Sequence, residues 1–239
     1  ELLAKVGISH VDYDGAKNNL EAEIKDWDFD AVRQSAHDMW AEELNQIQTK
    51  GGTEDERAIF YTSLYHTAIS PYTFSDVDGR YRGMDQEIHY SNGKTIYTVF
   101  SLWDTFRGQH PLKTITDPER DNEFINTLLT KYDQGGMLPK WELVANYTGT
   151  MIGYHSVPVI VDAYFKGIND FDVEKAYDAM VEAATCNTEG ILFPNERVQK
   201  KLMPMAKKFN VEMGYIPADM ENESVSKALE YAYNDWCIA

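Results

Sequence analysis

The stretch MIGYHSVPVIVDAYF, residues 151–165, decides the fold class that we expect for this chain. Apolar residues stand on almost every side of this stretch when it is drawn as a helix, which is typical of a helix buried among other elements. Pro158 argues against a regular helix, because proline donates no backbone hydrogen bond. The length and apolarity of the run still favour a buried helix over residues 151–165.

Other helical patterns lie on both sides of this stretch, and an N-cap signal opens several of them. Asp28 or Asp30 can cap one helix, Thr53 with Glu56 forms a capping box, and Asp117-Pro118-Glu119 opens another. The predicted helices span residues 13–24, 28–49, 54–69, 101–115, from 117 onward, 172–185, 196–209 and 222–239.

Short β-structure is predicted in the middle of the chain. Residues 72–99 place Asp-Gly and Asn-Gly turns between Tyr, Thr, Ile and Val, which indicates one or two small hairpins. Residues 133–149 are punctuated by Gly and Pro and predict a loop. We therefore expect a mainly α chain, with residues 1–239 as one unit of helical hairpins in an open bundle or a ring.

Charge and composition limit the classes of partner. Twenty-two Lys and Arg against 39 Asp and Glu give a net charge of −17, which would repel nucleic acid and anionic membranes. No apolar run approaches the ~20 residues of a membrane span. Cys186 and Cys237 show no metal-binding spacing and leave a disulfide open. Aromatic residues at 13% suit sugar binding, although they also fill protein cores.

Both ends of the sequence suggest a longer polypeptide. The chain begins ELLAKVG without methionine, and no signal peptide is visible. Residues 223–238 form a predicted helix that reaches Ala239 without a stop signal. Its predicted apolar stripe is Val225, Ala228, Leu229, Ala232 and Trp236. We expect an internal piece of a longer protein, with a natural C-terminal helix as the alternative.

The first candidate site is Trp103-Asp104-Thr105-Phe106-Arg107. On a helix, Trp103 and Phe106 share one face, and Asp104 and Arg107 are also three residues apart. An indole face beside a carboxylate and a guanidinium fits a pyranoside, whose C–H face stacks on the ring while its hydroxyls bridge the charged groups. The alternative is an Asp–Arg pair that ties a helix start to its neighbours.

The second candidate is Glu142, beside Trp141 in the predicted loop. A carboxylate next to an indole in a loop that enters the core fits an acid with a raised pKa. A loop anchor held by a salt bridge fits the same sequence equally well.

Three further features have a simpler interpretation. Asp76 and Asp78 faintly resemble a calcium loop, but a hairpin turn explains them better because the downstream ligands are missing. Glu223, beside Asn222 and Ser224, fits the acidic start of the last helix, with a substrate-facing role as the minor alternative. His155 is predicted to be a hydrogen-bonded core residue that could also touch a ligand.

Several common catalytic motifs are missing from the sequence. It contains no GxSxG, GxGxxG or P-loop pattern, and its histidines have no HxH or HExxH spacing. These absences argue against serine hydrolases and nucleotide-dependent enzymes. A carboxylate-based hydrolase or a binding module remains.

Four segments together resemble glycoside hydrolase family 92: FYTSLYHTAISPYTFSDVDGRYRGMD, YTVFSLWDTFRGQHPL, GGMLPKWELVANYTGTMIGYHSVPVIVDAYFKGI and ESVSKALEYAYNDWCIA. The resemblance runs from about residue 6 to residue 239. It implies the first part of an (α/α)6 barrel, or toroid, in a calcium-dependent exo-α-mannosidase that degrades glycans. Such an enzyme acts by inversion, with two carboxylates far enough apart to admit water. The family also has an N-terminal β-sandwich, which would be a partner of this segment within the parent polypeptide.

Carried over residue by residue, the resemblance makes this chain catalytically incomplete. Trp103, Asp104 and Arg107 match the motif expected to hold the terminal mannose, and Glu142 and Glu223 are added as candidate substrate-binding residues. The resemblance places the catalytic pair and the main calcium ligands downstream of Ala239. It also implies a periplasmic, secreted or cell-surface location. Two alternatives stay open: a non-catalytic helical module that binds carbohydrate or another partner, and a toroid enzyme of another sugar family with Glu142 as acid.

Overall fold

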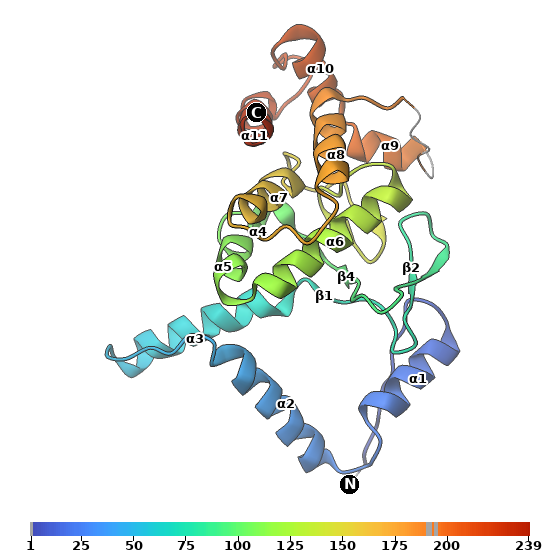
Figure 1. Cartoon of the computed structure of the whole chain (residues 1–239), viewed down its shortest axis with the longest axis vertical. Coiled ribbons are helices and arrows are strands. Elements are labelled where there is room, and N and C mark those ends of the chain that lie inside the picture. Colours follow the sequence, from blue (N-terminus) through green and yellow to red (C-terminus); the bar gives the residue numbers. More distant parts are fainter. Residues whose placement is uncertain (1, 190–192, 194–195) are drawn as a thin grey trace.

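The computed structural model describes residues 2–189, 193 and 196–239, and it is mainly helical, as the sequence predicts (Figure 1). The first three helices extend away from the body and are α1 (Tyr13–Glu23), α2 (Phe29–Leu44) and α3 (Glu54–Ile69). The helices of the body are α4 (Leu102–Thr105), α5 (Gln109–Thr116), α6 (Pro118–Gly135), α7 (Ser156–Phe165), α8 (Val173–Thr185), α9 (Glu196–Leu202), α10 (Met205–Met213) and α11 (Ser224–Ile238).

Helix α7 is the buried helix that the apolar stretch predicts, but it begins at Ser156 rather than at Met151. Met151 and Gly153 have φ values of 63° and 77°, which belong to a loop and not to an α-helix. Pro158 consequently lies in the first turn, where its missing N–H would have had no partner within the helix. The helix packs against α5, α6, α8 and α11 and so lies at the centre of the body.

Helix α11 turns a different face to the body from the one that its apolar stripe predicts. Val225, Leu229 and Trp236 are 69–74% exposed, whereas Tyr231 and Asn234 are buried. Asn234 fixes this rotation, because it accepts a hydrogen bond from the backbone N–H of Tyr154 and donates one to His155 Nδ1, both in the loop before α7. Of the predicted stripe, Ala228 does pack against the core, but its large side chains face away from it, because polar contacts set the orientation of this helix.

Three two-stranded antiparallel pairs accompany the helices in the described part of the chain. They join β1 (Tyr72–Thr73) to β4 (Tyr97–Thr98), β2 (Arg80–Arg82) to β3 (Ile88–Tyr90), and β5 (Glu142–Leu143) to β6 (Asn146–Tyr147). Residues 83–87 connect β2 to β3, so the predicted Asp-Gly and Asn-Gly turns flank this hairpin instead of forming its tip. The third pair lies inside the predicted loop 133–149 and was not predicted.

Helix boundaries follow local capping and breaking residues. Side chains of Asp28 and Asp117 cap α2 and α6, and Thr53 with Glu56 forms the predicted capping box of α3. Two predicted helices are divided in the structure. Residues 101–115 separate into α4 and α5 around Gly108, and residues 196–209 separate into α9 and α10 at Pro204.

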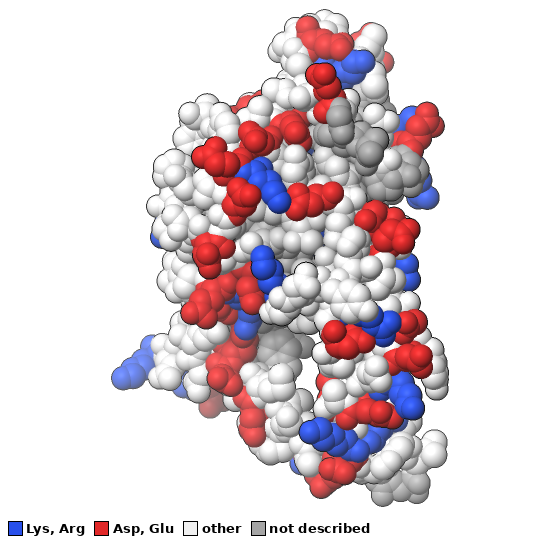
Figure 2. All heavy atoms as spheres, turned by 45° about the vertical axis from the view of Figure 1, so that its right-hand side comes forward, with Lys and Arg blue, Asp and Glu red and all other residues white. Residues whose placement is uncertain are grey.

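The N-terminal helices form an open arm below the body (Figure 1). Helices α2 and α3 contain no buried residue. Phe29 and Met39 of α2, and Trp27 just before it, are more than 60% exposed. Ion pairs from Glu43 to Lys113 and Arg120 connect the arm to α5 and α6. The face drawn in Figure 2 carries many Asp and Glu side chains with Lys and Arg dispersed among them, which matches the acidic composition.

Candidate functional site

Two helices that are far apart in sequence build the candidate site. Trp103 lies on the short helix α4, and its indole Nε1 donates a hydrogen bond to Glu230 Oε1 of α11 at 3.2 Å. Arg107, in the turn after α4, donates to the same oxygen at 3.2 Å. The side chain of Glu230 is 18% exposed and that of Arg107 is 49% exposed. One carboxylate oxygen therefore holds two of the residues that the sequence identifies.

Arg107 also covers the aromatic rings that precede it. Its guanidinium carbon lies 4.6 Å from the centre of the Trp103 ring and 4.7 Å from that of Phe106, within the range of cation–π contacts. The half-buried indole, the accessible guanidinium and the carboxylate form a compact polar and aromatic surface. Such a surface offers a ring for sugar C–H groups and charged partners for hydroxyls.

His155 lies directly behind this surface and is 1% exposed. Its ring stacks on Phe106 with centroids 4.1 Å apart and planes inclined by 7°. Its Nε2 lies 3.0 Å from Glu230 Oε2, and Asn234 Nδ2 lies 3.0 Å from its Nδ1. Burial lowers the pKa of His155 to about 4, although the Glu230 carboxylate acts in the opposite direction. The prediction of a hydrogen-bonded core histidine is confirmed.

Asp104 does not share this arrangement. Its carboxylate is exposed and accepts a hydrogen bond from Ser101 Oγ, while Arg107 makes its ion pair with Glu230. The Asp–Arg pair that the sequence offers as the structural alternative is thus replaced by an Arg–Glu pair between α4 and α11. Asp104 stays accessible for a ligand beside Trp103.

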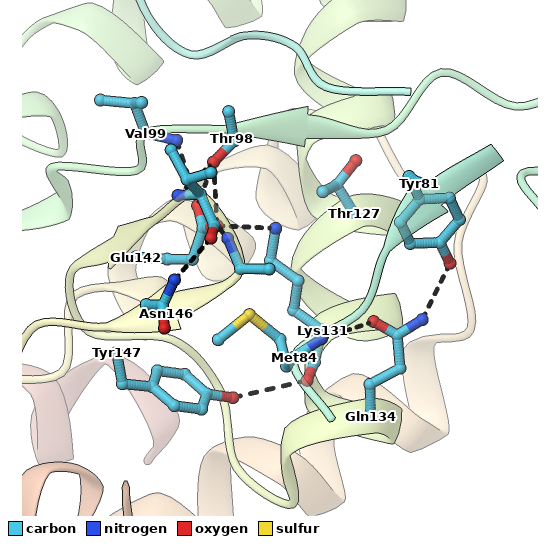
Figure 3. A network of polar contacts seen from close by, with 12 residues as sticks. Tyr81, Met84, Thr98, Val99, Thr127, Lys131, Gln134, Glu142, Asn146 and Tyr147 are labelled. Atoms are coloured by element: carbon cyan, nitrogen blue, oxygen red, sulfur yellow. Dashed lines mark hydrogen bonds and ion pairs between the residues drawn. The ribbon is translucent and has the colours of Figure 1, made fainter. Parts of the chain in front are cut away.

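Glu142 occupies the loop-anchor role of its two alternatives (Figure 3). Its carboxylate is fully buried and forms an ion pair with Lys131 Nζ of α6 at 3.0 Å. It also accepts hydrogen bonds from Thr98 Oγ1, from Val99 N and from Ala145 N. The pKa of Lys131 is lowered from its usual value because burial disfavours its charged form, although the neighbouring Glu142 carboxylate acts in the opposite direction.

The surroundings of Glu142 decide what it can bind. Its two oxygens are used by groups of the protein itself, and its exposed area is zero. A sugar hydroxyl would have to displace one of these donors and would meet a buried ion pair. The structure therefore favours the loop anchor, which joins β4, β5 and α6, and the assignment of Glu142 to sugar binding stays a prediction.

Glu223 lies at the N-cap position of α11, is exposed and stands 3.3 Å from Lys227. It is seven residues before Glu230, which corresponds to roughly 10 Å along a helix. The structure therefore separates Glu223 from the surface around Trp103, and its role as a substrate-binding residue stays a prediction.

The residues present do not fit a calcium site. Asp76 accepts hydrogen bonds from Ser9 and Asn19, and Asp78 pairs with Arg80 Nε at 2.7 Å. Among the residues that the structure describes, no group of three His, Cys, Asp or Glu side chains could hold a metal ion. The structure therefore does not support the calcium-loop alternative for Asp76 and Asp78.

An apolar groove lies elsewhere, between α7, α8 and the end of α11. It has a volume of about 340 Å³ and is lined mainly by aliphatic and aromatic side chains, including Ile160, Phe171 and Met180. This lining offers few partners for sugar hydroxyls. The groove also contains Cys237, which is a free thiol like Cys186.

Over the described ranges, no helix has the length and apolarity to cross a membrane.

Sequence reasoning missed the residues of α11 that organise the site. Glu230 and Asn234 are one helical turn apart and hold His155, while Tyr231 and Asp235, also one turn apart, contact Tyr154. The signal that could have found them is polar: a carboxylate and an amide four residues apart in an aromatic-rich helix, ALEYAYNDW.

Comparison with known proteins gives one consistent family. A model of the glycosyl hydrolase family 92 catalytic domain matches residues 15–239. An "uncharacterized secreted glycosidase" of Arthroderma benhamiae is 29% identical over 98% of this chain and 27% of its own length.

Solved structures agree with this match. The family GH92 alpha-mannosidase BT3965 from Bacteroides thetaiotaomicron, also solved with mannoimidazole, is 39% identical, with a TM-score of 0.81 over 96% of this chain and 29% of its own. The inverting mannosidase BT2199 from the same organism is 31% identical, with a TM-score of 0.83 over 96% of this chain and 30% of its own. The chain thus spans less than a third of the length of these relatives. The chain belongs to glycosyl hydrolase family 92 and is part of its catalytic domain.

Proposed function

We propose that the polypeptide carrying this chain is an inverting exo-α-mannosidase, and that this chain supplies one side of its sugar pocket. The observation that carries the proposal is the joint placement of Trp103, Arg107 and Glu230 at an accessible surface. Family membership supports the reaction class, and the mannosidase structures named above support the substrate class.

The side chains at this surface suit recognition rather than bond cleavage. The Trp103 ring can offer the face that Arg107 does not cover to the C–H groups of a pyranose, and Arg107 can donate to vicinal hydroxyls. Asp104 is accessible and can accept from another hydroxyl. Glu230 already accepts from two protein donors, so it supports these residues instead of acting as a free acid. In this proposal the catalytic carboxylates and the calcium ligands lie outside the described residues.

A secreted, periplasmic or cell-surface location is part of the proposal. The fungal relative is described as a secreted glycosidase. Such a location would place the enzyme where it meets mannose-containing oligosaccharides, which we propose as its substrates in glycan degradation.

The test compares the complete polypeptide with this 239-residue chain. Both are assayed on an aryl α-mannoside and on mannobiose, with added calcium and with a chelator, and the anomer of the first product is read by NMR. The proposal expects calcium-dependent turnover with inversion by the complete polypeptide and no turnover by the chain alone. Turnover by the chain alone would contradict the proposal that the catalytic carboxylates lie in the rest of the polypeptide. A complete polypeptide that binds mannose without hydrolysing mannosides would favour the non-catalytic binding module.

A further inference from the structure

A chain of polar contacts fixes the protonated nitrogen of His155. The backbone N–H of Tyr154 donates to Asn234 Oδ1 at 2.9 Å, so this amide must present its NH₂ group on the other side. That NH₂ group lies 3.0 Å from His155 Nδ1, which therefore accepts the hydrogen bond. A neutral imidazole that accepts at Nδ1 carries its proton at Nε2.

The proton on Nε2 faces the carboxylate of Glu230. Nε2 lies 3.0 Å from Glu230 Oε2, and it has no well-aligned acceptor among the described residues. The short contact between this N–H and the carboxylate is electrostatically favourable, although it is less well aligned than a regular hydrogen bond. The imidazole is held in place from both sides, because its ring also stacks on Phe106.

The two oxygens of Glu230 consequently have different surroundings. Oε2 faces the buried imidazole, and Oε1 accepts from Trp103 and from Arg107 at the surface. The carboxylate joins a rigid buried group to two accessible ones. Its plane sets the direction from which the indole N–H and the guanidinium can approach it.

The segment that carries His155 is itself fixed. Tyr154 OH donates to Asp235, and Lys207 Nζ lies 3.0 Å from both groups in the same partly buried cluster. Two successive turns of α11 thus hold Tyr154 and His155 as a unit. Movement of Glu230 is restricted by this support rather than by its own helix alone.

We propose that Glu230 is a positioning residue for sugar binding, which holds the Trp103 indole and the Arg107 guanidinium in their binding orientation with His155 as its fixed support. This proposal rests on the proposed function for its effect on catalysis. The positioning of the indole can be measured without any sugar.

The experiment replaces Glu230 by Gln in the complete polypeptide. A glutamine has nearly the same shape, but if its oxygen serves Trp103 and Arg107, its NH₂ group meets the N–H of His155. Donor then faces donor, so the amide cannot satisfy both sides. The matched control is Glu212→Gln on α10, where an exposed glutamate stands 3.7 Å from Lys208.

Two readouts separate positioning from a general loss of structure. The first is the indole N–H resonance of Trp103 in protein labelled at the tryptophan indole nitrogen, assigned with Trp103→Phe. We expect Glu230→Gln to shift this resonance and Glu212→Gln to leave it in place. The second is kinetics on an aryl α-mannoside. We expect kcat/KM to fall by about 10- to 100-fold, mainly through KM, as for a lost hydrogen bond to a charged group.

Nonadditivity is the third measurement. If Glu230 acts through Trp103, the double variant Trp103→Phe/Glu230→Gln loses less than the product of the two single losses. An unchanged indole resonance, or fully multiplicative losses, overturns the proposal. If the wild-type polypeptide does not hydrolyse mannosides, the proposed function fails, and the indole resonance alone decides whether Glu230 positions Trp103.

Discussion

Trp103 and Glu230 are 127 residues apart in sequence, yet the indole Nε1 and the carboxylate Oε1 lie 3.2 Å apart. This contact connects the start of the body to its last helix. Because α11 also packs against α7, α8 and α10, the site depends on the complete assembly of the described helices.

Replacement of Trp103, Asp104 or Arg107 by Ala in the complete polypeptide is expected to weaken binding of the terminal sugar. We expect KM to rise and kcat/KM to fall by roughly 10-fold or more for each, the scale of one lost hydrogen bond to a charged group or of one aromatic contact. Steady-state kinetics on mannobiose measure the effect. Unchanged kinetics together with a lower Tm for all three variants would assign these residues to structure alone.

The sequence predicted the helices well because local signals determine them. The capping box at Thr53 and the Asp117-Pro118 start both appear where the sequence places them. The first turn of α7 was misplaced, since apolarity continues through residues 151–155 while backbone geometry changes there. Periodicity reports which residues are apolar, and it does not locate the turn before a helix.

The site was only partly predictable, because its partners come from distant segments. Trp103 and Arg107 could be selected from one short motif, whereas Glu230 becomes a candidate only once the structure shows that both side chains donate hydrogen bonds to it. For Glu142 the sequence left an acid and an anchor equally open. The contact with Lys131 decided between them, and no local pattern encodes that contact.

Glu142→Gln tests the anchor role through stability. Removal of one charge leaves Lys131 buried without its partner, and the free energy of unfolding should fall by about 3–5 kcal/mol at pH 7. Urea unfolding of this chain measures the loss. The double variant Glu142→Gln/Lys131→Met should recover part of it, because the unpaired charge is gone. A loss below about 1 kcal/mol would contradict a buried ion pair.

The pH dependence of the Glu142→Gln variant has a definite sign. Burial already lowers the pKa of Lys131, and the carboxylate is the group that raises it. Without that carboxylate the pKa of Lys131 falls further below its unfolded value. The unfolded state then binds more protons than the folded state, so stability rises with pH. We expect the deficit relative to wild type to shrink as the pH rises from 7 toward the pKa of lysine in the unfolded chain, about 10.4, and a constant deficit would contradict this account.

His155 should make the folded chain less stable in mild acid. Its pKa is lowered from 6.5 to about 4, so the unfolded state binds the extra proton between these values. Stability is retained above pH 6.5 and lost as the pH falls toward 4, by about 3 kcal/mol in total. Urea unfolding at pH 7, 5.5 and 4.5 measures this slope. His155→Asn, which keeps an acceptor for Asn234, should reduce the slope, and an equal slope in both proteins would assign it to other groups.

The N-terminal arm should be the first part of the chain that a protease cuts. Helices α2 and α3 bury no residue, and Lys50 is exposed in the connection between them. Local opening of such a segment costs little, because few apolar contacts are lost. Trypsin is therefore expected to cleave after Lys50 before it cleaves after Lys113 or Lys131, which are buried in the body. Mass spectrometry of the early products identifies the order.

The control for this prediction is Lys50→Gln, which removes the cleavage site without touching a buried contact. It should slow formation of the product that begins at Gly51 and leave the melting temperature unchanged. Early cleavage after Lys113 or Lys131 would mean that the body opens as readily as the arm. The ion pairs of Glu43 with Lys113 and Arg120, although largely buried, would then be too weak to distinguish the two parts.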